Sequence, residues 1–207
     1  MKDFLPGDES EAVLGVLRLF AARIDLEKVE ETIRGLEHLG DEAISGLASA
    51  LDDPDFDVRL LALEVLREWD GDTRTALTPL TETLRDPNRI VRIAAASALV
   101  RLAHEAQDAL PVLNDWLSSD DQPARLAAAN LILRIDGARQ QEMLEVFVDA
   151  AFNGDPTTRC STAWFLSELR GLAPAALPLL KRMQDDADSL VRSIVAEELS
   201  QPFDSES

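Results

Sequence analysis

The chain has 207 residues, of which 46% are hydrophobic, a proportion typical of a globular protein and too high for a disordered one. Its formal net charge of −19 repels phosphate backbones and anionic lipid heads, which argues against nucleic acid and membranes as partners. Cys160 is the only cysteine, no apolar run approaches the roughly 18 residues of a membrane span, and no signal peptide is visible, so we expect a cytoplasmic protein.

The first predicted element is an amphipathic helix near the N-terminus. Its apolar stripe consists of Val13, Leu17, Phe20 and Ile24. Asp8 or Ser10 would cap this helix. It opens a degenerate repeat over residues 9–39, in which Val29 takes the place of an arginine that recurs in every later repeat.

Five arginines mark the later repeats at intervals of 33 or 34 residues. They are Arg59, Arg92, Arg125, Arg159 and Arg192. Four positions before each arginine stands a short polar residue, which can accept a hydrogen bond from a free amide of a first helical turn. These predicted N-caps are Asp55, Asn88, Asp121, Asp155 and Asp188. The column predicts that a helix begins at the same point of every repeat.

Apolar residues follow each arginine at offsets of three, seven and ten, which place them on one stripe of a helix. The stripe includes small residues such as Ala62, Ala95 and Ala128 and large ones such as Leu66, Leu99 and Leu166. A further helix is predicted before each of these, and three of these helices carry an early proline, at Pro79, Pro111 and Pro178. The repeating unit is therefore helix, short turn, helix.

The segment Asp86-Pro87-Asn88-Arg89-Ile90-Val91-Arg92, followed by an Ala/Leu-rich helix, resembles a HEAT repeat, and Asp53-Pro54-Asp55-Phe56-Asp57-Val58-Arg59 has the same form. The nearest likeness is to the short repeats of phycobilin lyase-type proteins. The resemblance implies an all-α fold, a right-handed α-α superhelix of about six helix pairs, as one solenoid over residues 1–207. The repeats would span 9–39, 41–69, 73–103, 106–136, 138–170 and 172–201, with an acidic tail at 202–207. Ankyrin and tetratricopeptide repeats have a similar period, but their signature motifs are missing.

The resemblance also implies a structural role for the five arginines, which would bond acidic residues of the inter-repeat turns in a ladder along the stack. Six positions before the arginines stand residues able to accept such bonds, namely Asp53, Asp86, Ser119, Asn153 and Asp186. A planar guanidinium can meet two acceptors at once. We therefore interpret these arginines as structural rather than as a row that binds substrate.

The resemblance further implies that the second helix of each pair lines a concave groove, with residues at one, five and eight positions after the arginine facing it. The candidate groove residues are Ile93, Val100, Leu126, Leu133, Cys160 and Trp164, with Glu64, Glu68, Arg101, Arg134 and Glu168 at the rim. Exposed apolar patches with a polar rim commonly mark partner surfaces, and tryptophan is a frequent anchor. The alternative is that strong curvature buries these side chains between neighbouring helices.

We recognise no catalytic, cofactor-binding or metal-ligating constellation in the sequence. The only histidines are His38 and His104, and although His104-Glu105 resembles a pair of the HEAT-like deoxyhypusine hydroxylases, one pair cannot build their di-iron site. Cys160 is expected to have no histidine nearby, so a catalytic thiol is not predicted. We therefore expect no cofactor and no enzymatic activity.

Three functional hypotheses follow. The first is a scaffold that binds a protein or peptide in its groove; the charge favours a basic partner, although it can equally serve solubility alone. The second is an accessory or catalytic subunit resembling phycobilin lyases, for which tetrapyrrole binding would shift an absorption band. The third is an acidic inhibitor or immunity protein for a basic partner, whose binding would weaken sharply with salt. The sequence predicts neither the partner's identity nor the oligomeric state.

Overall fold

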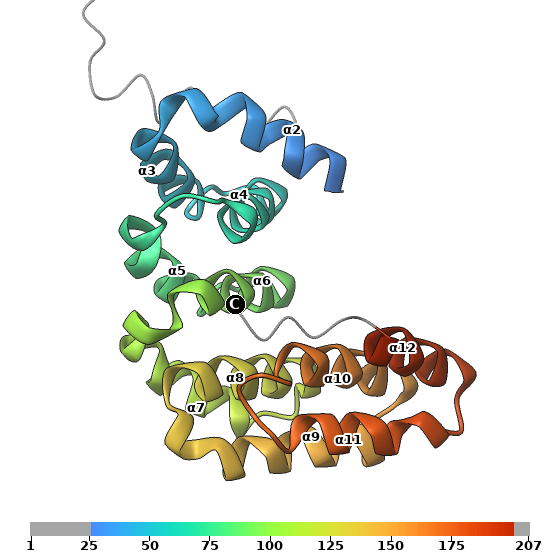
Figure 1. The fold of residues 1–207 in the computed structure, drawn as a ribbon. Coiled ribbons are helices and arrows are strands. Elements are labelled where there is room, and N and C mark those ends of the chain that lie inside the picture. Colours follow the sequence, from blue (N-terminus) through green and yellow to red (C-terminus); the bar gives the residue numbers. More distant parts are fainter. Residues whose placement is uncertain (1–25, 201–207) are drawn as a thin grey trace, which may run out of the picture. The chain divides into compact units, whose positions relative to one another are not determined.

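The structure, a computed structural model, describes residues 26–200, which form 11 α-helices and no strand (Figure 1). The helices belong to two compact units, Met1–Ala109 and Leu110–Ser207. The predicted all-α helical-repeat fold is confirmed, while the assignment of the whole chain to one solenoid stays a prediction. Within residues 26–200, every helix is too short or too polar to span a membrane. The predicted first helix and the acidic tail lie outside the described residues.

The first unit contains one helix and two helix pairs among its described residues. These are α2 (Leu26–Leu36), α3 (Asp41–Ala50) with α4 (Phe56–Glu68), and α5 (Leu77–Thr83) with α6 (Arg89–Leu99). Short 3₁₀ segments connect them, at Glu37–Leu39, Arg74–Ala76, Val100–Glu105 and Gln107–Ala109. α4 packs against α6 on one side and against α2 on the other.

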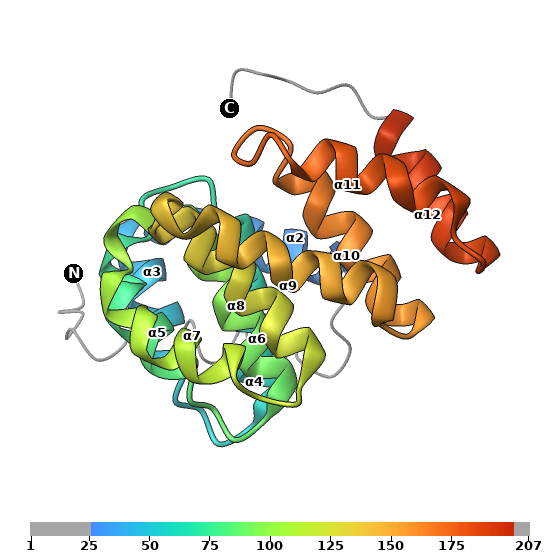
Figure 2. The same ribbon diagram turned by 90° about the horizontal axis from the view of Figure 1, so that it is seen from below.

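The described residues of the second unit, 110–200, form three helix pairs. They are α7 (Leu110–Leu117) with α8 (Gln122–Ile135), α9 (Gln140–Asn153) with α10 (Pro156–Glu168), and α11 (Ala176–Arg182) with α12 (Ser189–Ser200). The second helices of the pairs contact one another in the order α8, α10, α12, and each packs on the first helix of its own pair. Figure 2 shows this unit from below, with α9 and α11 crossing the layer of second helices.

All five predicted N-caps are confirmed. In each case a side-chain oxygen accepts a hydrogen bond from a backbone amide two or three residues further on, within the first turn. The acceptor and donor residues are Asp55 and Asp57, Asn88 and Ile90, Asp121 and Ala124, Asp155 and Thr158, and Asp188 and Leu190. The repeating polar column therefore sets where α4, α6, α8, α10 and α12 begin.

The core follows the predicted columns of the second helices. At offset three from the arginines, Ala62, Ala95, Ala128, Thr162 and Val195 are all buried. At offset seven, Leu66, Leu99, Ile132 and Leu166 are buried. The small residues of the first column let neighbouring helices approach closely, and the Thr162 hydroxyl meets its hydrogen-bonding need by donating to the Thr158 carbonyl at 2.8 Å.

We expect Leu166→Ala to lower the free energy of unfolding by about 2–5 kcal/mol, because the removed side chain leaves a cavity in a fully buried site. Leu99→Ala in the first unit should cost a similar amount, since Leu99 is equally buried. Urea unfolding followed by circular dichroism measures both.

The matched control is Leu172→Ala, which removes the same atoms from a leucine that is 51% exposed in the loop before α11. This variant should lie within about 0.5 kcal/mol of the wild type. Equal costs for Leu166→Ala and Leu172→Ala would contradict the assigned core.

Candidate functional site

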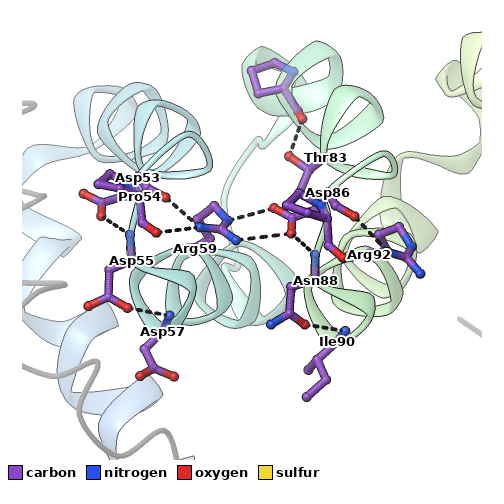
Figure 3. A network of polar contacts seen from close by, with 12 residues as sticks. Asp53, Pro54, Asp55, Asp57, Arg59, Thr83, Asp86, Asn88, Ile90 and Arg92 are labelled. Carbon is purple, nitrogen blue, oxygen red and sulfur yellow. Dashed lines mark hydrogen bonds and ion pairs between the residues drawn. The ribbon is translucent and has the colours of Figure 1, made fainter.

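A polar node joins the two helix pairs of the first unit (Figure 3). The Arg59 guanidinium of α4 donates from Nε to Asp86 Oδ2 at 2.7 Å and from Nη2 to Asp86 Oδ1 at 3.2 Å, so one carboxylate receives both arms of the fork. Asp86 Oδ1 also accepts from the backbone amide of Asn88 at 2.7 Å, and the Asp86 carbonyl accepts from Arg92 Nη1 at 2.9 Å. Asp86 thus connects α4 of one repeat with the start of α6 in the next.

The same node recurs in the second unit, with every partner 100 residues further along the chain. Arg159 Nε and Nη2 donate to Asp186 Oδ2 and Oδ1 at 2.8 and 2.9 Å, and Asp186 Oδ1 accepts from the Asp188 amide at 2.8 Å. The Asp186 carbonyl accepts from Arg192 Nη1 at 2.7 Å. The helix α10 is thereby fixed to the turn that starts α12.

The five arginines also share a contact within their own repeat, made to backbone oxygens. Nη1 donates to a carbonyl five or six residues earlier, at distances of 2.7–2.9 Å. The acceptors are the carbonyls of Asp53, Asp86, Ser119, Gly154 and Asp186. The side chains that we expected to accept these bonds therefore act differently. The carboxylates of Asp86 and Asp186 accept hydrogen bonds from the arginine of the preceding repeat.

Arg125 forms a third type of contact because Asn153, not an aspartate, occupies the corresponding turn position. Its Nη2 lies 4.0 Å from Asp149 Oδ2, on the last turns of α9, and Asn153 Nδ2 donates to Asp149 Oδ1 at 2.9 Å. A helix residue thus supplies the carboxylate that the turn lacks. Asp149 is one residue that the repeat pattern did not single out.

Hydrogen bonding shifts the ionisation of the second node. The Arg159 side chain, the main cause, lowers the pKa of Asp186, and the Asp188 amide acts in the same direction. The reciprocal bond raises the pKa of Arg159. The backbone amide of Thr158 lowers the pKa of the N-cap Asp155. Both charged forms of the node are therefore favoured in the folded protein.

The candidate groove residues of the first unit are only partly accessible. Ile93 and Val100 are half-buried, and Arg101 is exposed. The Arg101 guanidinium is not directed freely into solvent, because it donates to the backbone carbonyl of Trp69. A shallow depression beside it is lined by Asp72, Arg74 and Glu105 among others, and Arg74 pairs with Asp72 there.

In the second unit, the expected exposure of Leu126 and Leu133 is wrong. Their exposed fractions are 1% and 5%, since α8 is covered by α7, α9 and α10 and ten of its 14 residues are buried. Cys160 is half-buried and Trp164 is 44% exposed, both on α10. The accessible part of the candidate groove in this unit is therefore centred on α10.

Trp164 contacts an aromatic ring and lies one turn before a charged pair. Its ring meets that of Phe165 edge-on, with centroids 4.9 Å apart, and Phe165 in turn approaches Phe147 of α9 at 6.2 Å. One turn after Trp164, Glu168 Oε2 lies 3.9 Å from Arg134 Nη2 of α8. Arg134 Nε also donates to Asn130 Oδ1 at 3.3 Å, and burial lowers the pKa of Arg134.

The residues with catalytic potential are separated from one another. His38 and His104 are exposed on 3₁₀ segments of different repeats. Burial, followed by the charge of Asp188, raises the pKa of Cys160 and so favours the thiol over the thiolate. Among the described residues, no group of three or more His, Cys, Asp or Glu side chains is arranged to hold a metal ion.

A second exposed apolar patch was not predicted. Val148 and Phe152 are exposed one turn apart on α9, and the Arg182 guanidinium of α11 lies 4.6 Å from the Phe152 ring centroid. The signal was present in the sequence, because the apolar residues of 143–152 cover more of a helix than one buried stripe requires. This patch lies on the first helices rather than on the predicted groove helices.

A family model of HEAT repeats matches residues 44–133 and, a second time, residues 115–200. Among solved structures, one engineered protein is 22% identical over 96% of this chain and 93% of its own, with a TM-score of 0.53. Another engineered protein is 19% identical over 96% and 91%, with a TM-score of 0.52. The complex of CpcE and CpcF of phycocyanin lyase from Nostoc sp. is 19% identical over 96% and 88%, with a TM-score of 0.48. A search of curated proteins finds no match.

We expect Arg159 and Asp186 to be coupled more strongly than an exposed ion pair in a double-mutant cycle to alanine, because their two-armed, charge-assisted contact is largely shielded from water. The control cycle removes Lys28 and Glu31, an i, i+3 pair on the surface of α2. It should give about 0.3–0.5 kcal/mol. Coupling of the first pair no larger than that of the second would show that the node does not stabilise the fold.

The lowered pKa of Asp186 gives a pH dependence with a defined sign. A carboxyl whose pKa is lower in the folded state stabilises the fold above its unfolded pKa of about 3.9, and this contribution is lost as the pH falls through the folded pKa. The difference in unfolding free energy between the wild type and Asp186→Asn should therefore be constant near neutrality and shrink below about pH 4. Urea unfolding from pH 7 to 2.5 measures it, and an undiminished difference at pH 2.5 would refute the assignment.

Proposed function

Because the chain belongs to the HEAT-repeat family, we propose that it is a non-catalytic scaffold that binds a protein or peptide segment on the faces of its second helices. The fold suits this role, since stacked helix pairs present long, rigid surfaces on which a partner's side chains can be held in register. The observation that carries the proposal is the exposure of Trp164 on α10.

Trp164 differs from the other two tryptophans of the chain. It is 44% exposed, whereas Trp69 and Trp116 are 8% and 9% exposed. A tryptophan that contributes to the core gains stability by burial, while an indole left in water does not. Tryptophan is also the residue type most enriched at the centres of interfaces, where it contributes a large part of the binding energy. A role in partner binding accounts for its position.

The absence of catalysis is part of the same proposal. It is supported by the positions of the two histidines on 3₁₀ segments of different repeats and by the raised pKa of Cys160, which favours the thiol over the thiolate. The polar residues that recur most regularly, the arginines and N-cap aspartates, are engaged in holding the repeats together.

A basic partner fits the electrostatics best. With 39 acidic and 20 basic residues, the chain attracts positively charged segments over distances of about 10 Å at moderate ionic strength. Charge complementarity of this kind raises association rates and suppresses acidic competitors. We therefore propose a partner segment that carries lysine or arginine.

We expect Trp164→Ala to weaken partner binding at least about 30-fold, the loss typical of an anchor residue, with little change in melting temperature. A partner is captured from a lysate of the source cells, purified, and its affinity measured by isothermal titration calorimetry. Leu172→Ala, which removes another exposed apolar side chain of the same unit, is the control and should bind normally. Normal binding by Trp164→Ala, or a steep fall in its melting temperature, would refute this role.

The phycobilin lyase-like alternative predicts a different result. A tetrapyrrole added to the purified chain should then show a shifted absorption band, and the shift should depend on the groove residues. A scaffold for a protein segment predicts an unchanged spectrum. The experiment separates the two functions without knowledge of the partner.

A further inference from the structure

The exposed face of Trp164 is bordered by a carboxylate on its own helix. Glu168 follows it by four residues, so the two side chains lie on the same side of α10, about one turn apart. Glu168 is 52% exposed, and its contact with Arg134 is long, at 3.9 Å. The carboxylate is therefore accessible to a partner's charge.

A second carboxylate occupies the corresponding repeat position on α12. Trp164 stands five residues after Arg159, and Glu197 stands five residues after Arg192. Both arginines bind Asp186, one through its carboxylate and the other through its carbonyl, which fixes the register of α10 against α12. Because these two helices pack against each other, equal offsets give Trp164 and Glu197 corresponding positions on α10 and α12. Glu197 is exposed at this position.

The cations close to this face are already engaged by other groups. Arg134 of α8 is mostly buried and contacts Glu168, and Arg159 and Arg192 are bound to Asp186. The uncharged residues Cys160 and Ser161 lie one turn before Trp164 on α10, and Ser193 lies one turn before Glu197 on α12. An exposed indole with one carboxylate on its own helix and another at the corresponding position of α12 is a poor site for an acidic or purely apolar group.

The same arrangement suits a cation. The face of an indole carries partial negative charge and attracts a cation, and arginine adds flat stacking of its guanidinium on the ring. Phe165 meets the Trp164 ring at an interplanar angle of 63°, so it does not stack flat on the indole face. Carboxylates on both sides can pair with the remaining guanidinium N–H groups.

We propose that Trp164, Glu168 and Glu197 form a subsite for an arginine side chain of a basic partner segment. The subsite rests on the proposed function and specifies it, since it names the group that the scaffold recognises. Arginine is preferred to lysine because its planar group can stack on the indole and bond the carboxylates at the same time.

Indole N–H signals in two-dimensional NMR test the subsite directly. The three tryptophans give three signals, and Trp69 and Trp116, which are buried, serve as internal controls. The probe is the peptide acetyl-Gly-Arg-Gly-Arg-Gly-Arg-Gly-amide. In the control peptide, each arginine is replaced by citrulline, an uncharged analogue of nearly the same shape. We expect the Trp164 signal alone to move with the arginine peptide, and much less with the citrulline peptide.

Charge and aromatic variants identify the contributing residues. Trp164→Leu, which keeps an apolar surface, should weaken binding of the arginine peptide about 3- to 10-fold. Glu168→Gln and Glu197→Gln should each weaken it about 2- to 5-fold. Glu145→Gln, which removes an equal charge from the exposed face of α9, should weaken it less than about 2-fold, because solvent and salt screen distant charges. Unchanged circular dichroism spectra establish that each variant is folded.

Three results would overturn the arginine subsite: no movement of the Trp164 signal at millimolar peptide, an equal response to citrulline, or an equal loss in Glu145→Gln and Glu168→Gln. These outcomes are distinct from failure of the scaffold. A protein partner that is lost with Trp164→Ala but retained with Trp164→Leu would keep the proposed scaffold and refute recognition of a cation.

Discussion

The two-armed bond between an arginine on one second helix and an aspartate in the next intra-repeat turn is the interaction on which this fold depends. Asp86 and Asp186 each bind the preceding arginine, the amide of the following N-cap and, through the carbonyl, the next arginine. A carboxylate alone in such a shielded position would be costly, and the fork offsets this cost with charge-assisted bonds. One aspartate, through its carboxylate and its carbonyl, therefore fixes both the spacing and the register of neighbouring repeats.

Register matters because the proposed recognition face is assembled from different helices. Trp164 lies on α10 and Glu197 on α12, and no contact within one helix could bring them together. The offset of five from each node arginine is shared by both residues, so the node that holds the helices also aligns their outward rows. The column of arginines and the proposed binding row are thus coupled parts of the same repeat. A substitution of Asp186 would therefore alter the alignment of Trp164 and Glu197 without replacing either residue.

The sequence was informative wherever one residue type is required by local chemistry. An N-cap residue needs a short polar side chain, and a core column needs apolar residues at helical spacing. The roles of Asp155 and Leu166 could therefore be predicted from the sequence. The exposure of the residues one, five and eight positions after each repeat arginine depends instead on how closely successive helices approach one another. Leu126 and Leu133 follow the same spacing as Trp164, yet the packing around α8 buries them. That packing depends on how closely α7, α9 and α10 approach α8, which a periodic pattern does not specify.

The acidic charge of the chain has two different uses in the structure. Asp55, Asp155 and Asp188 cap helices, and Asp86 and Asp186 bind arginines, so these carboxylates are already engaged. They contribute to the long-range field but offer few free oxygens to a partner. Glu168 and Glu197 differ because one has only a long contact with Arg134 and both are exposed on the outer side of second helices. In the proposed function, net charge would draw a basic segment toward the whole chain, and discrimination between basic and neutral side chains would fall to Glu168 and Glu197.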